Sequence, residues 1–342
     1  MTRRVAVIAV KPARGETGGA ERLYEGLVSA LNKSGARADL INVVSDESCF
    51  EAIEETYLRI YDLDLSAYDG VISTKAPSYL IRHPNHICYL IHTMRVFYDM
   101  FENEFPHPTK ELMKQRNFIL NLDSAALSYP RTKKIFVIGN EVKNRLLKFN
   151  YLKSTVLYPA LPSDNFRQGS YQYIFTISRL HRWKRLDLII KAMKHIDRPL
   201  ELKIAGTGED EAWFRELADG DKRITFLGHV SDEELIGLYS NALVVPFVPK
   251  MEDYGYITIE AFRSCKPLIT CTDSGEPSYI VRDGESGFIC PPEPEAIASK
   301  IEYLYDNPEI AKKMGLHGKD SVKEITWEHV SEKLLQALGL NS

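Results

Sequence analysis

The feature that most constrains the fold is the repeated alternation of short β-branched runs with stretches of helical spacing. Such alternation is typical of βα units, in which helices cover both faces of a parallel sheet. It occurs in two series along the 342 residues. Because a single hydrophobic core rarely grows to that length, we expect two α/β domains of ordinary size.

The first series predicts a Rossmann-like layer. After its first strand, Leu23, Leu27, Ala30 and Leu31 recur at helical spacing and predict a helix. The predicted strands are Val5–Val10, Asp39–Val44, Gly70–Thr74, Ile87–His92 and Lys134–Ile138.

A linker is predicted between the two series, because residues 158–170 contain two prolines and a Gly-Ser pair. In the second series Ser231 and Glu234 form a capping box that predicts a helix start, and a further helix is expected over Leu186–Ile196. The strands predicted there are Tyr173–Ser178, Leu200–Ala205, Ile224–Gly228, Leu243–Pro246 and Pro267–Cys271. We therefore expect doubly wound domains over residues 1–165 and 166–325, which bind ligands at the carboxyl ends of their strands.

The composition limits the classes of function. With 44% hydrophobic and 26% charged residues, the chain is typical of a soluble globular protein. Its net charge of −4 argues against nucleic acid as the main partner, since that binding depends on many unpaired cations. Basic residues cluster between Arg131 and Lys153. This cluster fits a solvated helix face, or a peripheral contact with an anionic membrane at its inner face.

The sequence also favours a cytoplasmic location. No apolar run reaches the roughly 18 residues that a membrane span needs, and the apolar run after Arg4 is too short for a signal peptide. The 5 cysteines are odd in number and form no C-x-x-C pair. We expect them to be free thiols in a reducing compartment.

Two adjacent glycines, Gly18 and Gly19, open the first predicted helix. Glycine lets the backbone approach a ligand closely, and a helix N-terminus attracts anions. A phosphate could bind there, although a glycine-rich turn also serves packing alone in many βα units.

Cations follow the first strand of the second series. Arg179 and Lys184 lie five residues apart in a loop at the carboxyl end of that strand. A guanidinium and an ammonium so placed can neutralise a diphosphate leaving group. The alternative is a basic loop that is merely exposed to water.

Two carboxylates lie near the predicted helix start at Gly255. Glu252 precedes that start, and Glu260 lies within the first turns of the helix. Both can accept hydrogen bonds from sugar or ribose hydroxyls at the sheet edge. The helix dipole alone also favours acidic residues there, which accounts for Asp253 better than for Glu260.

Taken together, these motifs resemble retaining glycosyltransferase family 4, whose fold is of GT-B type. The similarity covers the second half of the chain and extends to the first glycine turn. It is carried in order by Gly18-Gly19-Ala20-Glu21-Arg22, Arg179 with Lys184, Ala205-Gly206-Thr207-Gly208, Phe226-Leu227-Gly228-His229-Val230, and the pair Glu252 and Glu260. The resemblance implies two Rossmann-like domains facing each other across a cleft, with residues 326–342 as a helix that packs back on the N-terminal domain.

The resemblance also implies roles for individual residues. Arg179 and Lys184 would hold the donor diphosphate, Glu252 would meet the donor sugar, and Glu260 would bind the ribose. Further contacts to the nucleotide or its phosphates would come from Gly18, Gly19, Gly206, Gly228, His229, Val230, Tyr256, Ile257 and Thr258.

A histidine in the first half resembles that of family members with mannose-type donors. His92 ends a predicted strand and would lie beside the transferred sugar, although satisfied structural histidines are common. His83 and His86 lack further ligands at metal spacing, so no metal or other cofactor is expected. The chain departs from the family pattern at Cys265, Glu276 and Tyr279, which concerns the sugar contacts more than the diphosphate site.

The predicted activity is transfer of a sugar from a nucleotide-diphosphate sugar to a saccharide, glycan or lipid-linked acceptor in polysaccharide, glycan or glycolipid biosynthesis. GDP-mannose is the first expectation for the donor, and a UDP-sugar the second. Alternatives are an epimerase or hydrolase of the same fold, or a non-catalytic partner subunit. A nicotinamide dehydrogenase would need G-x-G-x-x-G after the first strand, which the first loop lacks.

Overall fold

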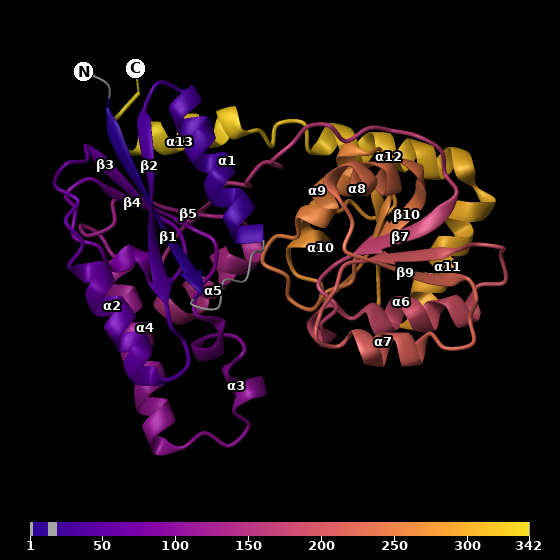
Figure 1. Cartoon of the computed structure of the whole chain (residues 1–342), viewed down its shortest axis with the longest axis horizontal. Helices are drawn as coiled ribbons and strands as arrows, with labels where there is room; N and C mark the ends of the chain where they lie inside the picture. Colours follow the sequence, from indigo (N-terminus) through magenta and orange to yellow (C-terminus); the bar gives the residue numbers. More distant parts are fainter. Residues whose placement is uncertain (1–2, 13–18, 342) are drawn as a thin grey trace. The chain divides into compact units, whose positions relative to one another are not determined.

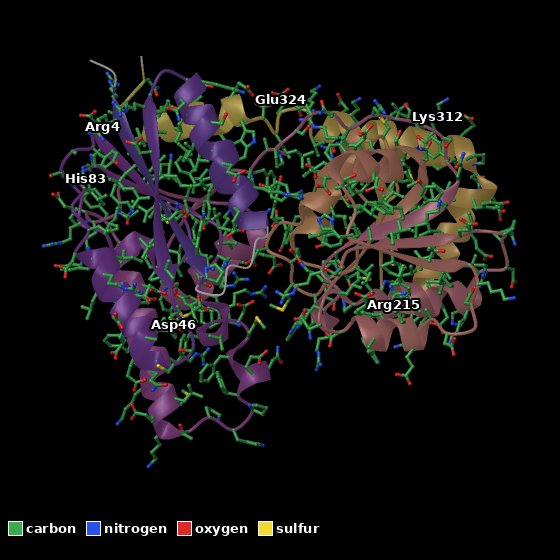
Figure 2. The ribbon with its side chains drawn as sticks, in the orientation of Figure 1. Arg4, Asp46, His83, Arg215, Lys312 and Glu324 are labelled. Atoms are coloured by element: carbon green, nitrogen blue, oxygen red, sulfur yellow. The ribbon has the colours of Figure 1, made fainter. Side chains whose placement is uncertain are left out.

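The computed structural model describes residues 3–12 and 19–341 and divides the chain into two compact units (Figure 1). Unit 1 comprises Met1–Pro162 and Ile325–Ser342, and unit 2 comprises Ser163–Glu324. The chain thus leaves unit 1 inside the predicted linker and returns after Glu324, which is labelled in Figure 2.

Unit 1 contains a six-stranded parallel sheet in the order β2-β1-β3-β4-β5-β6. Its strands are β1 (Arg4–Pro12), β2 (Arg37–Ser45), β3 (Gly70–Ser73), β4 (His86–Leu90), β5 (Ile135–Val137) and β6 (Thr155–Val156). Its α-helices are α1 (Gly19–Lys33), α2 (Phe50–Tyr61), α3 (Phe101–Glu104), α4 (Lys110–Leu127), α5 (Asn140–Asn150) and α13 (Trp327–Ala337), and short 3₁₀ helices span Ser78–Leu80 and Arg95–Phe97.

The last helix belongs to unit 1 and packs on its first helix. The Trp327 ring fills the space beside Gly26 of α1, where an added Cβ would come within 2.3 Å of the ring. The Trp327 indole N–H donates to the Leu161 carbonyl at 2.9 Å, and the hydroxyls of Ser34 and Ser331 lie 2.8 Å apart. Residues from both ends of the chain therefore build one core, with α13 lying beside α1 in Figure 1.

Unit 2 contains a second six-stranded parallel sheet, in the order β12-β11-β10-β7-β8-β9. Its strands are β7 (Tyr173–Ile177), β8 (Leu202–Ala205), β9 (Ile224–Gly228), β10 (Ala242–Pro246), β11 (Leu268–Cys271) and β12 (Gly287–Cys290). Its α-helices are α6 (Leu186–Ala192), α7 (Glu211–Leu217), α8 (Asp232–Asn241), α9 (Tyr256–Arg263), α10 (Glu276–Ile280), α11 (Pro294–Asp306) and α12 (Pro308–Ser321), with 3₁₀ helices η3 (Arg182–Lys184) and η4 (Met193–His195).

Local signals in the sequence explain several of these boundaries. α8 begins after Ser231, whose hydroxyl accepts from the Glu234 N–H at 3.3 Å while the Glu234 carboxylate accepts from the Ser231 N–H at 2.8 Å. The predicted capping box is thereby confirmed. The helix predicted to reach Ile196 instead ends at Ala192 and continues as η4.

Every predicted strand overlaps a strand of the structure, and the expected α/β class of GT-B type with two doubly wound sheets is confirmed. Several predicted strand ends differ by one or two residues, and β4 in particular stops at Leu90 rather than at His92. The short strands β6 and β12 were not predicted. No helix within residues 3–12 and 19–341 is both long and apolar enough to cross a membrane.

Candidate active site

Most of the predicted site residues lie at the carboxyl edge of the sheet of unit 2. All six strands of this sheet run parallel, so the loops that follow them emerge at the same edge. The order of the strands makes β11, β10 and β7 direct neighbours. The segments that follow these three strands carry Lys184, Glu252 and Glu276.

An ion pair joins two of the predicted catalytic residues. The ammonium of Lys184 donates to the Glu252 carboxylate at 2.5 Å, although 68 positions separate them in the chain. Both side chains are partly buried, with 27% and 22% of their surfaces exposed. The structure thus brings together one cation and one carboxylate at the sheet edge, where a charged ligand can exchange with either partner.

Arg179 lies in the same loop but has a different partner. Its Nε donates to the Glu209 carboxylate at 3.0 Å, and the side chain is 57% exposed. His181 Nε2 lies 3.5 Å from the other oxygen of Glu209. In the same loop the Arg182 N–H donates to Asp210 at 2.7 Å and holds the pKa of that carboxyl below its usual value. Glu209 and Asp210, which follow β8, therefore accept hydrogen bonds that hold this basic loop in place.

Gly206 has a structural reason to be glycine. Its φ of +108° is left-handed, and an added Cβ would come within 2.0 Å of the Ser178 carbonyl oxygen. Gly208 likewise lies against the backbone of Leu180. These glycines let the loop after β8 approach the loop that bears Arg179.

The residues predicted to face the base follow β9. Gly228 has a φ of +68° with open space around it. His229 and Val230 line a shallow pocket of about 400 Å³ beside α8. Its other lining residues are Tyr173, Leu227, Glu234, Gly237, Leu238 and Asn241.

The helix start predicted after Glu252 is present. α9 begins at Tyr256, after Gly255 with a φ of +78°, so Tyr256, Ile257 and Thr258 form its first turn. The backbone N–H groups at this helix N-terminus carry partial positive charge, which favours a bound anion. Glu260 lies one turn further, is 6% exposed, and accepts a hydrogen bond from the Tyr239 hydroxyl at 2.7 Å.

The three departures from the family pattern have different surroundings. Glu276 is fully buried, and its N–H donates to the Glu252 carbonyl at 2.9 Å. Tyr279 is 53% exposed. Cys265 has a φ of +55°, which is the conformation that glycine adopts most easily.

The predicted residues of unit 1 follow two different strands, β1 and β4. His92 lies two residues beyond β4, is partly buried, and its Nδ1 lies 2.7 Å from the Thr93 carbonyl oxygen. Gly19 is the exposed first residue of α1, and Gly18 lies outside the described residues. Within residues 3–12 and 19–341, no group of three or more His, Cys, Asp or Glu residues is arranged to hold a metal ion.

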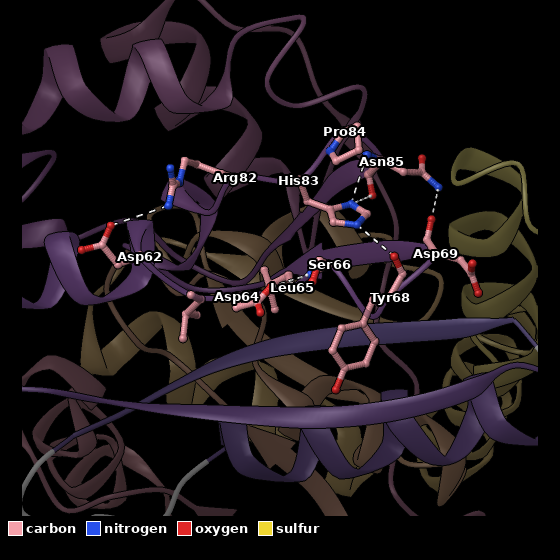
Figure 3. Close-up of a pocket in the computed structure, with 11 residues that line it drawn as sticks. Asp62, Asp64, Leu65, Ser66, Tyr68, Asp69, Arg82, His83, Pro84 and Asn85 are labelled. Atoms are coloured by element: carbon pink, nitrogen blue, oxygen red, sulfur yellow. Dashed lines mark hydrogen bonds and ion pairs between the residues drawn. The ribbon is translucent and has the colours of Figure 1, made fainter.

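A polar pocket of about 650 Å³ in unit 1 was not predicted. It lies beside the amino ends of β3 and β4, the edge opposite to the one where α/β sheets bind ligands. Figure 3 shows contacts among its lining residues: the side chains of Arg82 and Asp62 lie 3.7 Å apart, and His83 Nε2 lies 3.0 Å from the Tyr68 main-chain carbonyl oxygen. The pocket is lined by residues 62–66, 68–69 and 82–85.

Sequence reasoning missed one residue of the site in unit 2. Arg185, next to Lys184, reaches the loops after β10 and β11 through its guanidinium. The basic run 182–185 contains three cations, and their order in the chain does not reveal which of them points to a carboxylate in a distant loop.

The family described as glycosyl transferases group 1 matches residues 159–321. D-rhamnosyltransferase WbpZ of Pseudomonas aeruginosa is 27% identical over 157 residues, which cover 45% of this chain and 41% of the relative. Human alpha-1,3/1,6-mannosyltransferase ALG2 is 27% identical over 214 residues, covering 53% of this chain and 51% of the relative. The matches therefore span about half the length of these curated relatives.

A solved structure extends the likeness in fold to nearly the whole chain. Sucrose-phosphate synthase from Thermosynechococcus elongatus has a TM-score of 0.76 and 18% identity, and the match covers 98% of both chains. At this identity the likeness establishes the fold alone, so the activity has to be inferred from the residues of the site.

Proposed function

We propose that the protein is a retaining glycosyltransferase that uses a nucleotide-diphosphate sugar, on the premise that its residues 159–321 match the family described as glycosyl transferases group 1. The observation that carries the proposal is the ion pair of Lys184 and Glu252 at the carboxyl edge of unit 2. This edge is where open α/β sheets bind nucleotides. The pair offers a cation to a diphosphate and a carboxylate to sugar hydroxyls.

In the proposed reaction the bond between the sugar C1 and the diphosphate oxygen breaks, and its electron pair stays on that oxygen. Lys184 and Arg179 stabilise the charge that develops there, which is the largest demand of this chemistry. The acceptor hydroxyl oxygen forms the new bond to C1 from the same face. Its proton passes to an oxygen of the departing diphosphate, so the transfer retains the configuration.

The remaining residues bind the donor. The partly exposed first turn of α9, at Tyr256 and Ile257, lies where the polarity of the helix N-terminus favours the phosphates. Glu252 accepts from hydroxyls of the donor sugar once Lys184 turns to the diphosphate. Glu260, oriented by Tyr239, accepts from the ribose. Cationic side chains supply the neutralisation, so the proposed mechanism is independent of metal.

We place GDP-mannose first among the donors and UDP-sugars second. The names of the relatives, a rhamnosyltransferase and a mannosyltransferase, support a hexose or deoxyhexose and an acceptor that is itself a saccharide or glycoconjugate. The five cysteines are free, which supports a cytoplasmic reaction.

A donor screen tests the proposal. Thermal shifts with GDP, UDP and ADP identify the base, since a ligand at about 100 times its Kd stabilises by roughly 2.7 kcal/mol. The corresponding nucleotide sugars are then incubated with and without saccharide acceptors, and released nucleoside diphosphate is measured. Acceptor-dependent release is expected. Full-rate consumption of donor without acceptor would instead identify a hydrolase or an epimerase.

A further inference from the structure

Arg185 occupies a strained backbone position beside the proposed catalytic lysine. It lies between η3 and α6 with a φ of +52°, in the left-handed region. A residue with a Cβ adopts this conformation at a cost of about 1 kcal/mol or more, so other contacts must hold it there. Its side chain makes several such contacts.

The guanidinium of Arg185 is bound on two sides. Its Nε donates to the Val248 carbonyl and its Nη2 to the Pro249 carbonyl, both at 2.8 Å. Nη1 and Nη2 also donate to the two oxygens of Asp273, each at 2.7 Å. The side chain is only 15% exposed. A planar fork of this kind fixes direction as well as distance, which a lysine ammonium cannot do.

The loops that Arg185 reaches are those that place Glu252. The Glu252 N–H donates to the Ser274 carbonyl at 3.0 Å, one residue after Asp273. On the other side of Lys184, the Trp183 carbonyl accepts from the Lys250 N–H at 3.0 Å. The loops after β7, β10 and β11 are thus joined, and the ion pair of Lys184 and Glu252 lies within this connection.

We propose that Arg185 is a positioning residue for sugar transfer: by joining three loops it sets the position of Lys184, the partner of Glu252, against the diphosphate. The inference rests on the proposed function of this site. Arg185 touches no reacting atom in this role. Its effect on the reaction passes through Lys184.

A double-mutant cycle tests this coupling. Arg185→Lys keeps the charge and loses the fork, so we expect kcat to fall by about tenfold to 10²-fold, as small displacements of catalytic groups cause. In a Lys184→Ala background the same change should lower kcat by less than about twofold, since residues that act as a unit are not additive. Asp273→Asn should reproduce part of the loss with Arg185 intact. Binding of GDP and UDP is measured by calorimetry on each protein.

The matched control is Arg198→Lys. Arg198 makes the same kind of two-fold contact, to Asp306 at 2.9 and 2.7 Å, on the surface of unit 2. Its replacement should leave kcat unchanged. If Arg185→Lys and Lys184→Ala have additive effects on kcat in an active protein, Arg185 is merely structural and the inference is overturned, while the proposed function stands. If the wild type neither transfers sugar nor binds a nucleoside diphosphate, both fall.

Discussion

The two sheets of the molecule have the same number of parallel strands but place their charged and polar groups differently. In unit 2 the ion pairs of Lys184 with Glu252 and of Arg185 with Asp273 lie in loops at the carboxyl edge. In unit 1 two titratable groups, Asp123 on α4 and His86 on β4, are buried. Unit 2 thus places charged pairs at the edge where a ligand would bind, whereas Asp123 and His86 of unit 1 lie in its core.

Asp123 and His86 show what burial does in unit 1. Asp123 on α4 is fully buried, and it accepts from the hydroxyls of Tyr57 and Tyr98 at 2.8 and 2.7 Å. Burial raises its pKa to about 6. His86 on β4 is 1% exposed and lies 2.8 Å from the Ser73 hydroxyl, and burial lowers its pKa to about 4. Burial therefore shifts the titration of each group toward its neutral form.

The largest expected effect breaks the charge arrangement of unit 2. Lys184→Ala removes the cation that stabilises the leaving diphosphate, so turnover should fall by on the order of 10²-fold or more. Initial rates of nucleoside diphosphate release measure this. Lys191→Ala is the control, because Lys191 pairs with Asp187 at 2.9 Å on the outer part of α6. Equal turnover of both variants and the wild type would remove the proposed mechanism.

A pH experiment sharpens the contrast by separating the two buried groups of unit 1. In Asp123→Asn only the depressed pKa of His86 remains, so stability should rise with pH between about 4 and the unfolded value near 6.5. In His86→Asn only the raised pKa of Asp123 remains, so stability should fall as pH rises from about 4 to about 6. Each slope should approach about 1.4 kcal/mol per pH unit, with opposite signs.

Urea unfolding at about pH 4.5 and about pH 6, followed by hydrogen exchange in α4 and β4, measures these slopes for unit 1. All other titratable groups contribute equally to both slopes of stability against pH, so their contributions cancel when one slope is subtracted from the other. Slopes of the same sign and size would show that neither group is held neutral by burial.

The smallest effect concerns packing. Gly26→Ala places a Cβ against the Trp327 ring, so unit 1 should lose about 1 kcal/mol or more of stability, as overpacked cores do. Gly237→Ala is the matched helical control in unit 2, since no atom lies within 4 Å of its added Cβ. That change should be neutral or stabilising by up to about 1 kcal/mol. Thermal midpoints compare the two, and equal shifts would show that the Trp327 contact is readily rearranged.

Much of the fold was predictable because local patterns determine it. Buried β-branched runs such as Val5–Val10 indicate strands, and Ser231 with Glu234 marks the start of α8. β12 was missed because its residues, Gly287–Cys290, include a single β-branched side chain and follow a polar turn. Its place beside β11 depends on pairing across the sheet.

The candidate site was predictable to a lesser degree. Spacing and resemblance indicated Lys184 and Glu252, but not that they pair with each other across 68 positions. Arg185 escaped notice because its partner Asp273 lies 88 positions away. Likewise, the hydroxyl that orients Glu260 comes from Tyr239 on another helix. Contacts of this kind are set by the tertiary fold, which no local pattern records.

The contact of α13 with α1 has a consequence for how the protein is made. Because α13 comes from Trp327–Ala337, the segment that completes unit 1 leaves the ribosome only after all of unit 2. A nascent chain halted at residue 324 would hold every residue of unit 2 but a unit 1 in which the surface around Gly26 still awaits Trp327. Because synthesis runs from the N-terminus to the C-terminus, unit 2 can be completed before unit 1.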